Sequence, residues 1–450
     1  MKTFKRICAL SLTVLLMSGT SALPTSADVY AAPSAMSAAA SVNDDYNYTV
    51  NSNNTVTITK YKGRETDVKI PQSISGKTVT EIGSSAFKNC TTLKTVYIPK
   101  SIRTINGNAF IGCNNLQSFK TDSKSSYFTA VNGVLFNKNK TSLKIYPNGR
   151  SGKYTVPSGV TVIDKYAFSE CNKLTYVYVP GSVKTIEFNA FAYCLGLKNI
   201  TLNNGLTTLK TAAFNGCKNL ESIDIPESVS VIEKYAFSSC QKIKNITIPE
   251  KVTVLNFSLF EGCTSLSNVN LSDKTTKIYS NVFDHCSSLV SVRLPESVTK
   301  IYSLAFCCCE NLKSLTILSN NVQIDNIAFT SCPKLTVYAK KGSTAEAAAK
   351  ANGVKFSDKK PPMQDASVIG VLDRTVCISA KVIDGAEPYT FAVYYKNIND
   401  KNWSIAQNYS SNNKIRFTLP KAGTYKIYLR IKDAERRMIS KEYTVSVRIG

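Results

Sequence analysis

The sequence predicts a solenoid of stacked 23-residue repeats, with a parallel β-sheet on its concave side, followed by an all-β sandwich. The main observation is a Phe-x-x-Cys pair that occurs ten times and steps by 23 residues without a break from Phe168 to Phe329. A second is a short apolar and polar alternation that proline closes in several units, as at Val96–Pro99. The third is the loss of this phase after Phe356, where longer alternating runs begin. One unit cannot bury its own apolar face, whereas stacked units share a continuous core.

The N-terminus has the form of a secretory signal. Three basic residues precede an apolar run from Ile7 to Met17, and small residues follow. Such a run is too short to span a bilayer and is removed on export. We assign residues 1–27 to the signal, with cleavage after one of the alanines at 22, 27 and 31, and residues 28–45 to an Ala/Ser-rich linker. The mature chain is therefore expected to be secreted or held at a bacterial surface, without a transmembrane segment.

The solenoid is assigned to residues 46–357. Within each unit the apolar positions follow Leu-x-x-Val-x-Ile-Pro-x-x-Val-x-x-Ile, which predicts a short strand with one buried face. Proline then ends the strand, because it lacks the N–H that a central ladder needs. The 58-residue step from Phe110 to Phe168 is one repeat plus a 35-residue excursion, which reads as a β-hairpin or an enlarged coil. The ten pairs are Phe87/Cys90, Phe110/Cys113, Phe168/Cys171, Phe191/Cys194, Phe214/Cys217, Phe237/Cys240, Phe260/Cys263, Phe283/Cys286, Phe306/Cys309 and Phe329/Cys332.

A short helix is expected at the end of the stack. Ser343 and Glu346 have the spacing of a capping box, alanines follow, and Gly353 stops the helix. A helix at this place would cover the last open edge of the sheet, which otherwise invites aggregation.

The last part of the chain is predicted to be a separate sandwich. Residues 358–364 form a charged, proline-containing linker, and residues 365–450 contain about seven strand-like runs separated by turn residues. Cys377 has no partner in this segment, so an internal disulfide is excluded there.

The repeat pattern resembles the BspA-like subclass of bacterial leucine-rich repeats, whose units read Leu-x-x-Val-x-Ile-Pro-x-x-Val-x-x-Ile-x-x-x-Ala-Phe-x-x-Cys. The resemblance implies a leucine-rich-repeat solenoid and adhesion to host matrix, host cells or other bacteria. The C-terminal segment resembles an immunoglobulin-like domain of the three-tyrosine type found in clostridial surface proteins. That second resemblance depends on five aromatic residues: Tyr394, Tyr395, Trp403, Tyr425 and Tyr428.

The charge points to anionic partners. The formal net charge is +24, and +21 remains once the three basic residues of the signal are removed. A basic exported protein is drawn to anionic cell-wall polymers, acidic glycans or phospholipid headgroups. Nucleic acid is not an expected partner, since the positive residues are spread along the chain without a recognisable module. The chain has one histidine, which disfavours histidine-based catalysis, and we expect neither an enzyme nor a cofactor.

The outward strand positions are the candidate binding residues. In register, they form rows of one residue per coil, filled mainly by short hydroxyl and amide side chains. Such a face suits an extended polar ligand, with aromatic side chains as anchors. The alternative is that Thr, Asn and Tyr are simply good strand residues that keep the face soluble. The candidates are Tyr97, Lys120, Tyr176, Tyr178 and Arg293.

The cysteines raise a separate question. The ten repeated cysteines occupy one position in the coil and are expected to point inward as thiols, since stacked parallel side chains do not face one another. Cys307 and Cys308 fall on turn positions, which we expect near the surface. Asp284 and His285 precede them by one 23-residue step, so the four side chains form a candidate zinc site. Chance drift and a vicinal disulfide are the alternatives.

Three functions follow from these observations. The first is a non-enzymatic surface protein that binds host or bacterial proteins or glycans through its concave face. The second is an architectural protein held on the cell wall by its basic surface. The third is a metal or thiol site at His285, Cys307 and Cys308.

Overall fold

The computed structural model describes most of the chain after the predicted linker. The described residues are 41–42, 45–359, 364–365, 368–372, 375–380, 382–383, 389–433 and 438–447. The predicted signal at 1–27 and most of the segment 28–45 lie outside these residues. No helix within the described ranges is long and apolar enough to cross a membrane. The domain boundaries assigned from the sequence stay predictions.

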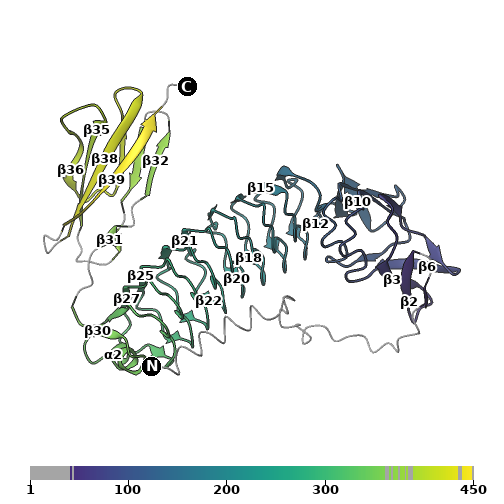
Figure 1. Ribbon diagram of the computed structural model, residues 1–450, viewed down its shortest axis with the longest axis horizontal. Coiled ribbons are helices and arrows are strands. Elements are labelled where there is room, and N and C mark those ends of the chain that lie inside the picture. The colour runs from purple at the N-terminus through teal and green to yellow at the C-terminus, as the bar shows by residue number, and fades with distance from the viewer. Residues whose placement is uncertain are drawn as a thin grey trace. The chain divides into compact units, whose positions relative to one another are not determined.

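The repeat region contains two ladders of parallel strands, each of which is divided into several shorter sheets (Figure 1). The first is the predicted sheet, here called the long-strand ladder, in which Thr95 pairs with Ser118 and Tyr176 with Asn199. Its strands are β4 (Asp67–Lys69), β7 (Thr95–Ile98), β9 (Ser118–Thr121), β13 (Gly152–Thr155), β15 (Leu174–Val179), β17 (Asn199–Leu202), β19 (Ser222–Ile223), β21 (Asn245–Thr247), β23 (Asn268–Asn270), β25 (Ser291–Leu294), β27 (Ser314–Ile317), β29 (Thr336–Tyr338) and β30 (Lys355–Ser357).

The second ladder was not predicted. Most of its strands are only two residues long, such as β16 (Thr185–Ile186), so they show no alternation that sequence analysis detects. The isoleucine that ends the repeat pattern lies in this ladder and is buried there. The other strands are β8 (Thr104–Ile105), β12 (Ser142–Ile145), β14 (Val162–Ile163), β18 (Thr208–Leu209), β20 (Val231–Ile232), β22 (Val254–Leu255), β24 (Lys277–Ile278), β26 (Lys300–Ile301) and β28 (Gln323–Ile324).

The stack begins with a hairpin. Strand β2 (Tyr46–Val50) pairs antiparallel with β3 (Val56–Tyr61), which pairs in parallel with β6 (Lys77–Ile82). Two short strands complete this end, β1 (Ser41–Val42) and β5 (Ser73–Ile74). The ring of Tyr61 stacks on Phe87 with 5.0 Å between centroids, so the hairpin also starts the aromatic column of the core.

A column of stacked phenylalanine rings runs through the coils. Phe168 and Phe191 lie 4.6 Å apart with nearly parallel planes, and Phe214 and Phe237 lie 5.6 Å apart. All the repeated phenylalanines are at most 1% exposed. Offset aromatic stacking adds to the free energy that their burial already provides. The fixed step of 23 residues therefore follows from the need to place one ring on the next.

The repeated cysteines are hydrogen-bond donors as well as apolar filler. The Sγ atom of Cys217 donates to the carbonyl oxygen of Phe191 in the preceding coil at 3.0 Å, and Cys309 donates to Phe283 at 3.1 Å. The same bond, between 2.9 and 3.2 Å, is made by Cys113, Cys194, Cys240, Cys263, Cys286 and Cys332. None of the cysteines among the described residues is disulfide-bonded, and their oxidation state in the protein stays a prediction.

Burial makes these thiols unreactive, which gives a first prediction. Burial raises the pKa of Cys263 to about 12 and also raises that of Cys240 and Cys286, whereas thiolate is the nucleophilic form. We expect a disulfide reagent at pH 8 to modify only exposed Cys377 and half-buried Cys90 quickly, and the other thiols only in denaturant. Mass spectrometry of modified peptides checks this. Rapid native labelling of Cys240 would show that the coils open more easily than this packing implies.

The 35-residue excursion is a hairpin followed by a shortened coil. Strands β10 (Phe128–Val131) and β11 (Val134–Asn137) pair antiparallel, and β11 also pairs antiparallel with β12. Strand β12 then pairs with β14 in the second ladder, and β13 pairs with β15 in the long-strand ladder. The ring of Tyr146 stacks on that of Phe168 with 5.0 Å between centroids. Only residues 146–151 link β12 to β13, whereas residues 187–198 link β16 to β17. This coil therefore lacks the wide turn of its neighbours.

The predicted helix is α2 (Thr344–Ala351), which buries three alanines. Its C-terminus is as expected: Gly353 has a φ of 66°, and its N–H donates to Lys350 while that of Val354 donates to Ala349. The predicted capping box is wrong in detail. The Glu346 carboxylate accepts from the N–H of Gly342, and the Ser343 hydroxyl makes no cap bond, because the turn before the helix is displaced by one residue.

The C-terminal segment forms two larger antiparallel sheets that share one buried core, and a two-stranded antiparallel sheet of β31 and β34. One has the order β32-β33-β37 and the other β36-β35-β38-β39. Val376 and Ile427, from different sheets, belong to the same cluster. The Tyr425 hydroxyl donates to the carbonyl of Lys421 at 3.1 Å, the tyrosine corner of immunoglobulin-like sandwiches. The strands are β31 (Gln364–Asp365), β32 (Val368–Leu372), β33 (Thr375–Ser379), β34 (Val382–Ile383), β35 (Thr390–Asn397), β36 (Ser404–Ser410), β37 (Lys414–Thr418), β38 (Gly423–Lys432) and β39 (Met438–Val447).

Candidate functional site

The outward side chains of the long-strand ladder lie where the sequence predicts them over most of its length. Lys120 is exposed, Tyr178 is 37% exposed, and Tyr97 and Tyr176 are half-buried. The Tyr176 hydroxyl lies 2.9 Å from the Thr201 hydroxyl, the outward residue of the next strand. A hydrogen bond of this kind holds the ring against the face, so that little rotamer entropy is lost when a ligand covers it.

Two lysines that the sequence analysis missed lie over these tyrosines. Lys69 on β4 pairs in register with Tyr97, and its Nζ atom is 5.5 Å from the ring centroid. Lys153 on β13 pairs with Tyr176, and its Nζ atom is 6.0 Å from that ring. Each tyrosine is thus combined with a cation at cation–π distance. The face offers aromatic stacking and positive charge at the same points.

Both lysines were missed for the same reason: they lie on strands outside the Phe-x-x-Cys phase. Strand β4 precedes the first pair, and β13 belongs to the shortened coil. A signal for β13 was present, because Tyr146 stands 22 residues before Phe168, close to one full step. The column of rings therefore marks coils that the cysteine pattern leaves out.

The rows are not exposed throughout. Arg293 on β25 is exposed, as predicted. Ser291, Ser314 and Thr316, which lie in the same rows by register, are instead only 3%, 1% and 5% exposed. Hydroxyl side chains are small enough to be buried once they are hydrogen-bonded, and polarity alone does not distinguish the two cases. A ligand has access only to Arg293 among these four residues.

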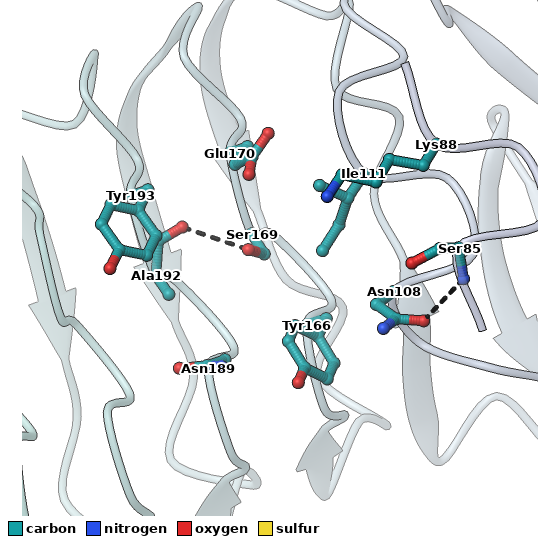
Figure 2. Close-up of a pocket in the computed structure, with 10 residues that line it drawn as sticks. All are labelled: Ser85, Lys88, Asn108, Ile111, Tyr166, Ser169, Glu170, Asn189, Ala192 and Tyr193. Atoms are coloured by element: carbon teal, nitrogen blue, oxygen red, sulfur yellow. Dashed lines mark hydrogen bonds between the residues drawn. The ribbon is translucent and has the colours of Figure 1, made fainter. Parts of the chain in front are cut away.

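A pocket lies on the turns beside the shortened coil. Figure 2 shows Glu170 and Lys88 toward one end of it and Tyr166 and Asn189 toward the other. Its volume is about 180 Å³, which is room for roughly six waters or one small polar molecule. The lining residues are Ser85, Lys88, Asn108, Ile111, Tyr166, Ser169, Glu170, Asn189, Ala192 and Tyr193.

The missing turn explains the pocket. The coils on either side of the Tyr146 coil are in direct contact. They approach so closely that a Cβ placed on Gly107 would collide with the carbonyl oxygen of Lys165. No residue of 146–151 lines the pocket. Burial raises the pKa of Glu170, and the positive charge of Lys88 opposes this shift. The sequence carries no signal for this pocket, since the pocket arises from the length of a neighbouring turn.

Three of the four residues of the candidate zinc site come together on the same row of turns. Backbone bonds link successive coils there: the N–H of Gly262 donates to Asp284 at 2.8 Å and that of His285 to Cys307 at 2.9 Å. The Sγ atoms of Cys307 and Cys308 lie 3.3 Å apart. One ligand atom each from Asp284, Cys307 and Cys308 lie within 4.8 Å of one another.

The expectation that Cys307 and Cys308 lie near the surface is wrong. They are 4% and 8% exposed, and Asp284 is 5% exposed. The reason is that the turns stack on one another, so that in several coils the first residue after the phenylalanine is buried. Ser169, Asn215 and Ser238 occupy this position in other coils and are buried too.

His285 is the partly exposed member of the cluster. Its Nδ1 atom lies 2.7 Å from Asp284 Oδ1, and 32% of its side chain is exposed. The Asp284 carboxylate, and after it the Cys308 side chain, raises the pKa of His285 to about 10. Half-buried Glu261 lies one coil earlier; burial raises its pKa, and the Asp284 charge adds to this. The imidazole is thus held as a cation against the carboxylate.

Comparison with known proteins gives a family match and several similar structures. A model of the BspA type leucine-rich repeat region matches residues 57–150, 144–263 and 207–336 in six copies. The chain is similar to a leucine-rich repeat protein of Eubacterium ventriosum (21% identity over 60% of this chain and 94% of that one, TM-score 0.45). It is also similar to a leucine-rich cell surface protein of Faecalibacterium prausnitzii (25% identity over 72% of this chain and 99% of that one, TM-score 0.42). A third similar structure is the pneumococcal vaccine antigen PcpA (17% identity over 72% of this chain and 99% of that one, TM-score 0.37). No curated protein sequence matches the chain.

Proposed function

Because the chain belongs to the BspA-type leucine-rich repeat family, we propose that it is an exported, non-enzymatic protein that binds an extended polar ligand through the face of its long-strand ladder. The ligand class is a surface protein or glycan of a host or of another bacterium. The observation that carries the proposal is the pairing of Lys69 with Tyr97 and of Lys153 with Tyr176.

The chemistry of these pairs favours a ligand with both flat and anionic groups. A tyrosine ring gives a large contact area at low entropic cost, and a nearby ammonium attracts carboxylate or sulfate. Lys120, in register with Tyr97, adds a third positive charge on the same face. An acidic glycan or an acidic protein segment fits this arrangement. Arg293 and Tyr178 are proposed contacts of the same kind.

The experiment compares binding by the mature protein and by face variants. Matrix proteins and a glycan array that includes acidic polysaccharides identify the ligand, and Tyr97→Ala with Tyr176→Ala should weaken its binding by about 30-fold or more, as for two moderate hot spots. Lys69→Gln with Lys153→Gln should reduce both the affinity and its salt dependence. Tyr409→Ala, at a 38% exposed tyrosine of the C-terminal sheets, is the control.

Two outcomes would contradict this proposal. Equal affinity in the wild type and in both face variants would exclude this face. Salt-sensitive binding to isolated cell wall alone, unchanged by the variants, would instead support the architectural function, in which the net positive charge acts without a specific site.

A further inference from the structure

The buried cluster on the turn row can be interpreted independently of the long-strand face. It combines one carboxylate, one imidazole and two thiols from two successive coils. The fold does not require these residues, because other coils have Asn215-Gly216 or Ser238-Ser239 at the positions of Cys307-Cys308. Packing alone therefore gives no reason for four ligand-type side chains to meet here.

The backbone at these positions belongs to the fold, not to the cluster. His285 and Cys308 have φ angles of 57° and 55°, in the left-handed region. The equivalent residues of other coils, such as Ser239 and Gly262, share this conformation. The cluster thus occupies a rigid, repeated turn. A rigid support of this kind holds metal ligands well, since little reorganisation is needed on binding.

One polar atom of the cluster, Asp284 Oδ1, is short of hydrogen bonds for a buried atom. Asp284 Oδ1 is buried and makes no hydrogen bond of normal geometry among the described residues, although His285 Nδ1 lies 2.7 Å away as an ion-pair contact. An ionised carboxylate in such surroundings is costly. The imidazole supplies one positive partner, and a bound cation would add a second.

We propose that Asp284, Cys307 and Cys308 bind one thiophilic divalent cation of the zinc class, with His285 holding the carboxylate in place. Two sulfur ligands of one tetrahedral zinc lie about 3.8 Å apart, so the observed 3.3 Å between the Sγ atoms must widen by only about half an ångström. The three ligand atoms already lie within 4.8 Å of one another. Water or a ligand from outside completes the fourth position.

Binding follows a balanced exchange. The cation bonds to two thiolate sulfurs and one carboxylate oxygen, and the two thiol protons are released to solvent. Sulfur ligands and a small, nearly closed site favour zinc over calcium and magnesium, which prefer oxygen ligands. Because the site is nine-tenths buried at Asp284, Cys307 and Cys308, the ion enters past the partly exposed His285.

The test uses the mature protein, reduced and freed of metal by a chelator under anaerobic conditions and then incubated with an excess of zinc. We expect one zinc ion per chain by elemental analysis after desalting, and cobalt(II) in its place to give sulfur-to-metal charge-transfer absorption. The double variant Cys307→Asn/Cys308→Gly copies the turn of Asn215-Gly216, so it should fold normally and lose both signals. His285→Ala should weaken zinc binding by about 10- to 100-fold.

The control is Cys240→Ala, which removes a buried thiol of the coils and should leave the metal content unchanged. The proposal fails if the reduced wild type holds no zinc, or if the double variant binds as much zinc as the wild type. In the protein purified in air, a mass lower by two hydrogens that is located at Cys307-Cys308 and restored by reductant, together with no zinc binding after reduction, would identify the pair as a vicinal disulfide instead.

Discussion

Replacing Phe214 by alanine is expected to destabilise the repeat region by about 3–5 kcal/mol. Phe214 is fully buried, and its ring lies 5.1 Å from Phe191 and 5.6 Å from Phe237, with planes within 11° and 1° of parallel. Alanine leaves a cavity between two rigid neighbours that cannot move together, because each is fixed by its own coil. Urea unfolding followed by far-UV circular dichroism measures the loss.

A matched variant separates the aromatic column from aromatic content in general. Phe257→Ala removes the same atoms from a side chain that is 43% exposed and touches Tyr279 at 4.8 Å between centroids. We expect a loss of only about 1 kcal/mol there. Trp403, the single tryptophan, directly precedes β36 of the C-terminal sheets, so its fluorescence follows their unfolding separately. Equal losses in the two variants would mean that the column is not what holds the coils together.

The parts of the fold that depend on strict phase were predictable from the sequence. Phenylalanine, cysteine and the strand before the proline recur at fixed offsets, so their burial and the parallel register follow from one period. The two-residue strands of the second ladder could not be predicted, because two residues show no alternation. The role of the cysteine was only half predicted. Its size and position indicate burial, whereas the bond from Cys217 to the Phe191 carbonyl depends on how adjacent coils are offset.

The candidate sites divide in the same way. Tyr97, Tyr176 and Lys120 were predicted because they lie in phase, and Lys69 and Lys153 were missed because their strands do not. The approach of Asp284 to Cys307 and Cys308 was predicted from the 23-residue step. Their burial was not, because it depends on the next turn covering the side chain. The pocket beside the Tyr146 coil arises because the turn of that coil is shorter than the turns of its neighbours. No residue pattern in the sequence predicts this pocket.

Replacing Gly205 by alanine is expected to lower the free energy of unfolding of the repeat region by about 3 kcal/mol. This is the second of the two largest effects that we expect. Gly205 has a φ of 121°, where side chains are rarely tolerated, and a Cβ there would collide with the carbonyl oxygen of Gly181 in the preceding coil. The coil differs from its neighbours in sequence. Asn203-Asn204-Gly205 stands where they have Pro180-Gly181-Ser182 and Pro226-Glu227-Ser228. Without the proline, the strand ends by a tight turn that only glycine can make.

Gly159→Ala is the matched control for this prediction. Nothing lies within 4 Å of a Cβ at Gly159, and its φ is outside the left-handed region. Alanine there should change the free energy of unfolding by no more than about 0.5–1 kcal/mol. The change should be stabilising, because alanine reduces the conformational entropy of the unfolded chain. The measurement is again urea unfolding, with hydrogen exchange of the coils around residues 181–228. Because each coil depends on its neighbours for stability, the coils next to Gly205 should lose hydrogen-exchange protection first. If protection instead falls uniformly along the stack, the coils unfold as one cooperative unit, and the strain at this turn is shared by all of them.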